Sequence, residues 1–180
     1  MTRLRNMGAS PTPSKGLLTC LALDWLAPAV WTGGLIIIVA VVIPAVFNSF
    51  GMEPGGRFLT RTFDGYNRAV LVAMALMGGA LAGRAWLTQA GEPQAQPGRA
   101  EALLFGIMVV VALAIIAWLG PESVILQEEA FAVKDDTARK IAYAAFFKVH
   151  TVVRALYILN LGLGIALMVV KLKSYVKNYL

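Results

Sequence analysis

The sequence has few of the residues from which catalytic and metal sites are commonly built. It contains one cysteine, Cys20, and one histidine, His150, in 180 residues. A single cysteine excludes a disulfide within the chain, and no cysteine–histidine cluster is available for a zinc or copper centre. The sequence also lacks a glycine-rich phosphate-binding loop, a Ser/His/Asp arrangement and paired carboxylates within its apolar stretches. It therefore gives no case for a hydrolase or a proton-coupled transporter, and we expect no enzymatic activity.

Charge is scarce as well. Charged residues make up 14 % of the chain and hydrophobic residues 58 %, whereas about 25 % of the residues in soluble domains are charged. A helix needs roughly 20 mostly apolar residues to cross a bilayer. Four stretches approach or exceed this length, at about 25–52, 66–86, 102–119 and 149–170. The sequence therefore predicts an all-α fold, a four-helix transmembrane bundle of a multi-pass membrane protein.

The remaining segments are two tails and the connections between spans. We expect a basic N-terminal tail at 1–24, a single four-span membrane domain at 25–172 and a basic C-terminal tail at 173–180. Because basic segments favour the cytoplasm and contact anionic lipid head groups, both termini are expected there. A short interfacial helix is expected after spans one and three; the second, at 135–148, fits equally well as an extension of span four. No motif indicates nucleic-acid binding.

Small residues predict where helices approach closely. In lipid, helix association depends on close packing, which glycine permits. Gly33 and Gly34 lie in span one, while Gly79 and Gly83 are four residues apart in span two. Pro44 falls late in span one, where it kinks or ends the helix. We expect these five positions to serve helix packing.

One end of the bundle is predicted to hold polar side chains. At 3.6 residues per turn, His150, Arg154 and Tyr157 fall on one stripe of span four. A cation more than a turn inside a span is costly unless it is paired or reaches water. Arg68 is expected at the same membrane level, next to Asp64. These observations predict a ligand pocket walled by Arg68, His150, Arg154 and Tyr157, at the end remote from the termini.

Three interpretations of this polar cluster remain open. In the first, the cluster only holds the connection between spans three and four in place. In the second, it binds an anionic or quinone-like ligand. In the third, His150 is the single axial ligand of a haem or another tetrapyrrole. One histidine cannot provide two axial ligands within a monomer. No other cofactor is expected.

The two halves of the chain share a plan. Each has a span ending in proline, a charged connection, and a span with arginine in its first turns, so that Arg68 and Arg154 correspond. Two explanations fit this likeness. A hairpin has been duplicated, as in many membrane proteins built from repeats, or four apolar helices simply resemble each other in composition.

Several short motifs resemble a known family pattern. The motifs are Trp31-Thr-Gly33-Gly34, Pro44-Ala-Val-Phe47, Gly55-Gly56-Arg57-Phe58, Phe63-Asp-Gly-Tyr66-Asn67, Pro121 and Phe147-Lys-Val-His150. In this order they are similar to the four-helix membrane family called domain of unknown function 4149, over about residues 25–172. The resemblance implies a four-span fold without an established activity. Distantly similar four-helix families handle copper or porphyrins, which keeps the cofactor interpretation open.

The chain departs from this family pattern in span four. The pattern has a small hydroxyl residue three positions after the histidine and an asparagine soon after it. Here the first position is Val153, and the asparagine comes later, at Asn160. The departure weakens any polar function that the family shares in this span.

Three functions follow from these observations. The first, which the short connections and the missing catalytic set favour, is a non-enzymatic accessory or scaffold subunit that packs against other membrane subunits. The second is a small-molecule or ion-handling protein that uses the Arg68/His150/Arg154 pocket. The third is a tetrapyrrole-binding redox component with His150 as axial ligand.

Overall fold

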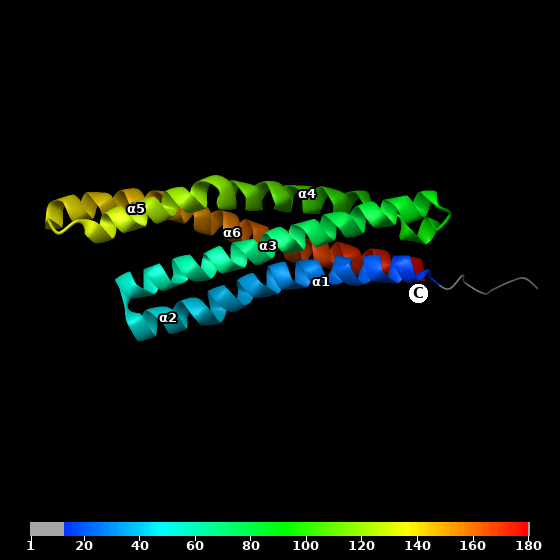
Figure 1. Ribbon diagram of the computed structural model, residues 1–180, viewed down its shortest axis with the longest axis horizontal. Coiled ribbons are helices and arrows are strands. Elements are labelled where there is room, and N and C mark those ends of the chain that lie inside the picture. The colour runs from blue at the N-terminus through cyan, green and yellow to red at the C-terminus, as the bar shows by residue number, and fades with distance from the viewer. Residues whose placement is uncertain (1–12, 180) are drawn as a thin grey trace, which may run out of the picture.

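The computed structural model describes residues 13–179, and within this range the chain is almost entirely helical (Figure 1). Its helices are α1 (Lys15–Ile37), α2 (Ile43–Phe50), α3 (Met52–Gln89), α4 (Arg99–Ala114), α5 (Gly120–Ala132) and α6 (Asp136–Tyr179). Two π-helical segments, η1 (Ile38–Val42) and η3 (Ile115–Leu119), join α1 to α2 and α4 to α5, and a short 3-10 helix, η2 (Pro93–Ala95), lies between α3 and α4.

The helices form four long rods that lie side by side. Four are long and apolar enough to cross a membrane, over Lys15–Phe50, Met52–Gln89, Arg99–Ala132 and Asp136–Val176. The predicted four-helix transmembrane bundle of a multi-pass membrane protein is therefore confirmed. In Figure 1 the start of α1 and the end of α6 lie at one end of the bundle, and the α2–α3 and α5–α6 turns lie at the other. We call these the terminal end and the turn end.

Local signals explain where the rods begin and reverse. Ser14 caps α1, because its Oγ accepts a hydrogen bond from the Leu17 amide at 3.2 Å. Asp135 caps α6 in the same way, through the Ala138 amide at 2.8 Å. Between α2 and α3 the chain reverses at Gly51, whose φ of 73° favours glycine. The connections at the turn end are therefore short.

The expected interfacial helices are not separate elements. Residues 52–65 form the beginning of α3, and residues 136–148 form the beginning of α6. The third rod likewise continues past Gly120 and Pro121 to Ala132. A separate interfacial helix is therefore not confirmed, and the alternative interpretation of 135–148 as an extension of span four is what the structure shows. Glycines, prolines and charges after span one were interpreted as the end of a helix, although a long helix accommodates all three.

Helical structure extends into both of the expected tails. Helix α1 begins at Lys15 instead of residue 25, and α6 continues through residue 173 to Tyr179. The first twelve residues of the predicted N-terminal tail lie outside the described residues.

Two of the prolines inside the rods, Pro44 and Pro121, follow a π-helical segment. The Ile43 amide donates to the Ile38 carbonyl ahead of Pro44, and the Gly120 amide donates to the Ile115 carbonyl ahead of Pro121. Proline has no amide hydrogen and interrupts the ordinary hydrogen-bond ladder. In the wide turn next to the proline, an amide bonds to the carbonyl five residues earlier instead of four, and this accommodates the interruption. Pro44 therefore alters the first rod locally without ending it.

The core lies where the rods meet. The buried Tyr66 hydroxyl on α3 donates to the Trp31 carbonyl of α1 at 2.9 Å and joins two rods directly. The buried core cluster comprises Ala27, Trp31, Leu35, Ile38, Tyr66, Val70, Ala73, Met77, Met108, Ala112 and Leu167.

Candidate functional site

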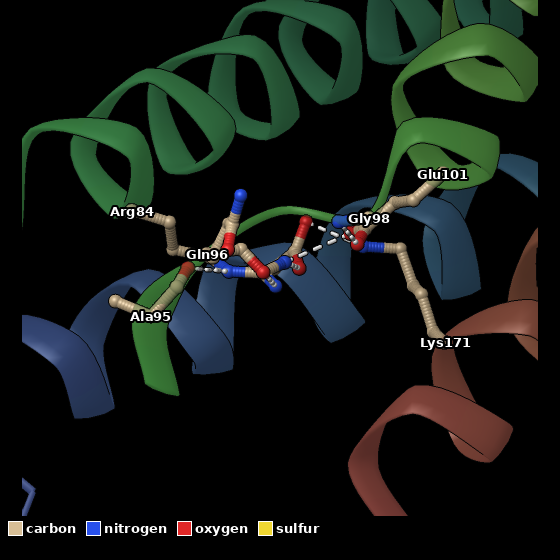
Figure 2. A network of polar contacts seen from close by, with 7 residues as sticks. Arg84, Ala95, Gln96, Gly98, Glu101 and Lys171 are labelled. Carbon is tan, nitrogen blue, oxygen red and sulfur yellow. Dashed lines mark hydrogen bonds and ion pairs between the residues drawn. The ribbon is translucent and has the colours of Figure 1, made fainter. Parts of the chain in front are cut away.

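Each of the four rods contributes one ionisable side chain to a closed ring at the terminal end (Figure 2). Arg84 of α3 contacts Asp24 of α1 at 2.5 Å and Glu101 of α4 at 2.8 Å. Lys171 of α6 contacts the same two carboxylates, each at 2.5 Å. Acid and base alternate around the ring, so that every member has two neighbours of opposite charge. We call these four residues the charge ring.

The charge ring is closed off from solvent. Its side chains are between 1 and 7 % exposed. The connection between α3 and α4 covers Arg84, whose Nε donates to the Ala95 carbonyl at 3.2 Å and whose Nη2 donates to the Gln96 carbonyl at 3.4 Å. The second oxygen of Glu101 accepts from the Gly98 amide at 3.4 Å (Figure 2).

Electrostatic attraction within this ring holds the ends of all four rods together. Two carboxylates and two cations balance to zero net charge, and burial strengthens each attraction by lowering the local dielectric. The same burial makes a missing partner costly, because the remaining charge has no water to solvate it. Losing any one member therefore leaves unpaired charge inside the bundle.

Sequence analysis missed the charge ring. It placed Asp24 in the N-terminal tail and found no paired carboxylates, whereas Asp24 and Glu101 share both Arg84 and Lys171. A signal was nevertheless present. Spans one and three begin next to an acid, and spans two and four end next to a base. In an antiparallel bundle these four positions meet at one end.

The predicted polar pocket looks different in the structure. Arg68 pairs with Asp64 of its own helix at 2.8 Å, and both side chains are exposed, at 78 and 63 %. Arg154 is also exposed. In the described part of the chain, no hydrogen bond or ion pair joins Arg68 to His150 or Arg154.

The other two pocket candidates have separate neighbours. The Nδ1 atom of half-buried His150 lies 3.5 Å from the Ser123 hydroxyl of α5, and its ring stacks on Phe146. The Tyr157 hydroxyl donates to the Asn67 side chain at 3.0 Å. Both contacts join α6 to another rod.

The four glycines among the packing candidates also differ in their surroundings. A Cβ at Gly34 would lie 3.2 Å from the Tyr66 ring, and a Cβ at Gly83 would lie 2.9 Å from the Cys20 sulfur. No neighbouring atom among the described residues lies within 4 Å of a Cβ at Gly33 or Gly79. Gly79 and Gly83 therefore do not share one packing contact.

A second polar spot lies deeper in the bundle. Gly164 of α6 lies so close to Thr32 of α1 that a Cβ there would overlap the Thr32 hydroxyl. One turn earlier on α6, the Asn160 amide donates to the Met108 carbonyl at 3.3 Å. The Thr32 hydroxyl and the Asn160 side-chain oxygen are buried, and neither has a hydrogen-bond partner within the described residues. We call Thr32, Asn160 and Gly164 the mid-bundle polar spot.

Comparison with known proteins gives one match. The family model described as Domain of unknown function (DUF4149) matches residues 26–132, more than half of the chain. The chain belongs to this family. The DUF4149 match contains Arg84 and Glu101 but ends before α6, so that Lys171 and His150 lie beyond it. No curated protein and no solved structure matches the chain.

The cofactor interpretation of this DUF4149 chain stays a prediction. Over residues 13–179 no group of three His, Cys, Asp or Glu side chains could hold a metal ion. A single axial bond from His150 to a tetrapyrrole is a different chemistry, which needs only one ligand. An absorption spectrum of the purified protein tests it, because bound haem gives a Soret band.

Proposed function

We propose that this protein is a non-enzymatic membrane component, an accessory or scaffold subunit of a larger membrane complex. The observation that carries the proposal is the charge ring. In this ring, one ionisable side chain from each rod forms ion pairs with side chains of two other rods, so that the four helices are held together as a unit. Such a unit presents a defined outer surface to its surroundings.

That outer surface is strongly apolar. Exposed large side chains occur on every rod, and Trp86 and Trp118 are each 71 % exposed. Lipid covers such faces, and helices of other subunits pack on them through van der Waals contact. Further examples are Leu26, Val41, Val72, Leu103, Val110, Ile125, Ile141 and Ile158.

Gentle extraction tests the proposal. The tagged protein, at native abundance and in a mild detergent, is expected to migrate as a complex larger than its own 19.3 kDa chain, with partner subunits in fixed stoichiometry by native mass spectrometry. An unrelated tagged four-span protein, purified in parallel, identifies adventitious partners. A monodisperse single chain that carries only lipid would contradict the proposal.

The mid-bundle polar spot favours ion or small-molecule handling as a second candidate function. Buried polar atoms nearly always have hydrogen-bond partners, and those without one call for an explanation. The Thr32 hydroxyl and the Asn160 oxygen can both accept a hydrogen bond from a small donor or contribute to binding a cation. We therefore propose the middle of the bundle as the candidate site for this second function, in place of the pocket predicted at Arg68, His150 and Arg154.

Flux measurements in proteoliposomes test this candidate. With protons and sodium ions as the probes, Thr32→Val is expected to reduce flux at least about tenfold, equivalent to about 1.4 kcal/mol, because it removes the hydroxyl at similar volume. Arg154→Ala, outside the spot, is the matched control and is expected to leave flux unchanged. Equal flux for Thr32→Val and wild type would exclude the mid-bundle spot. Loss of flux in Arg154→Ala alone would restore the pocket at the turn end.

A further inference from the structure

The first helices of the two hairpins carry the same features at a constant spacing. Asp24 and Glu101 are 77 positions apart, and so are Pro44 and Pro121. The π-helical segments η1 and η3 are separated by the same 77 positions. Each first helix therefore has an acid, a wide turn and a proline in the same register.

Burial along the first helices follows the same register. Five positions that are buried in one first helix are also buried at the corresponding positions of the other. Buried Asp24, Trp31, Leu35, Ile38 and Val46 correspond to buried Glu101, Met108, Ala112, Ile115 and Ser123.

The second helices match at a spacing of 87 positions. Arg84 and Lys171 correspond, which places Arg154 opposite Asn67 and corrects the expected pairing of Arg154 with Arg68 by one residue. Buried Tyr66, Ala73, Met77, Ala80 and Arg84 correspond to buried Val153, Asn160, Gly164, Leu167 and Lys171.

The acceptor position of one buried hydrogen bond repeats as well. The Trp31 carbonyl accepts from Tyr66 at 2.9 Å, and the Met108 carbonyl accepts from Asn160 at 3.3 Å. Trp31 and Met108 are corresponding residues, and each donor comes from the second helix of the same hairpin. The donors themselves do not correspond, because Tyr66 aligns with Val153 and Asn160 aligns with Ala73. Helices that resembled each other only in composition would have no reason to share one register and one buried face.

We infer that the chain consists of two copies of one helical hairpin, which bind each other through a self-complementary inner face. A pseudo-two-fold axis through the charge ring exchanges Asp24 with Glu101 and Arg84 with Lys171. Each hairpin presents one acid and one base at the same level. Its acid therefore meets the base of the copy while its base meets the acid of the copy, as in an isologous interface. The partner that fits the inner face of this hairpin is a second hairpin of the same kind.

Exchanging charges in the full-length chain tests the shared joint. The double variant Arg84→Lys with Lys171→Arg exchanges positions related by the axis. Its Tm is expected to fall by less than about 8 °C, because it loses only the hydrogen bonds from Arg84 to the Ala95 and Gln96 carbonyls. The double variant Asp24→Arg with Arg84→Asp keeps the pair inside one hairpin but sets like charges against Glu101 and Lys171. Its Tm is expected to fall by about 10 °C or more.

Either reverse result overturns the inference. An unchanged Tm for the Asp24→Arg, Arg84→Asp variant would mean that each hairpin is stabilised only by its own ion pair, and that the ion pairs between the hairpins contribute nothing. An equally large fall for the Arg84→Lys, Lys171→Arg variant would mean that the two bases are not equivalent.

Reversing the order of the hairpins tests the repeat independently of the charges. A chain with residues 93–180 followed by residues 1–92 contains the same residues, and the copies should assemble as before. We expect detergent-extracted permutant and wild type to show the same helicity and a Tm within about 4 °C. The control carries a short Gly-Ser insertion between residues 92 and 93. A folded control beside an unfolded permutant would overturn the inference.

Discussion

Asp24→Ala is expected to lower the free energy of unfolding by about 3–5 kcal/mol, the usual cost of removing one partner from a buried ion pair. The substitution leaves Arg84 and Lys171 with Glu101 as their only acid in the ring. Both cations are buried, and water cannot replace the lost carboxylate. The deficit should appear as a lower Tm and as a smaller folded fraction after detergent extraction.

Asp64→Ala is the matched control for this prediction. It also removes a carboxylate from an ion pair, but its partner Arg68 is exposed to solvent. Exposed pairs contribute about 0–1 kcal/mol, because water solvates both charges. Equal losses in the two variants would show that the charge ring is solvated and does not hold the rods together.

Gly164→Val is expected to destabilise the bundle by at least about 1–3 kcal/mol, the range for adding bulk to a packed core. Even a Cβ at this position would overlap the Thr32 hydroxyl and lie 3.4 Å from the Met108 side chain. The larger valine side chain must therefore separate α6 from α1 and α4. Thermal unfolding in detergent measures the loss.

Gly162→Val separates this packing effect from the effect of placing valine in a helix. Gly162 lies in the same helix, and no neighbouring atom in the described range is within 4 Å of a Cβ there. The control is expected to be close to neutral, since valine replaces a flexible glycine on an exposed face. A similar loss in both variants would contradict the close contact between Gly164 and Thr32.

The transmembrane fold was predictable because it depends on local composition. Roughly 20 apolar residues in sequence are enough to favour a helix across the bilayer, whatever the neighbouring helices are. Helix ends were less predictable. Pro44 was expected to kink or end its helix and Pro121 to follow the end of span three. Neither proline ends its rod, because each follows a wide turn within a continuous helix. The hydrogen bonds of that turn determine whether a proline ends a helix, and residue type alone does not reveal them.

The charge ring was the main feature that sequence analysis missed. Asp24, Arg84, Glu101 and Lys171 each lie at the end of an apolar stretch, where charges ordinarily reach the head groups. Their burial results from the packing of four helices and from the connection that covers Arg84. Conversely, Arg68 was expected in a shared pocket but has an exposed partner on its own helix.

By itself, the sequence determined that the protein has four apolar helices, that they form a membrane bundle, and that its halves share a plan. Each of these properties follows from the order of residues along one segment. Only the tertiary structure decided which charges are buried, which glycines are in contact and in which register the halves correspond. These properties depend on distances between helices far apart in the chain. A charge at the end of a span remains solvated when it stands alone, and it becomes a structural joint only when three others meet it inside the bundle.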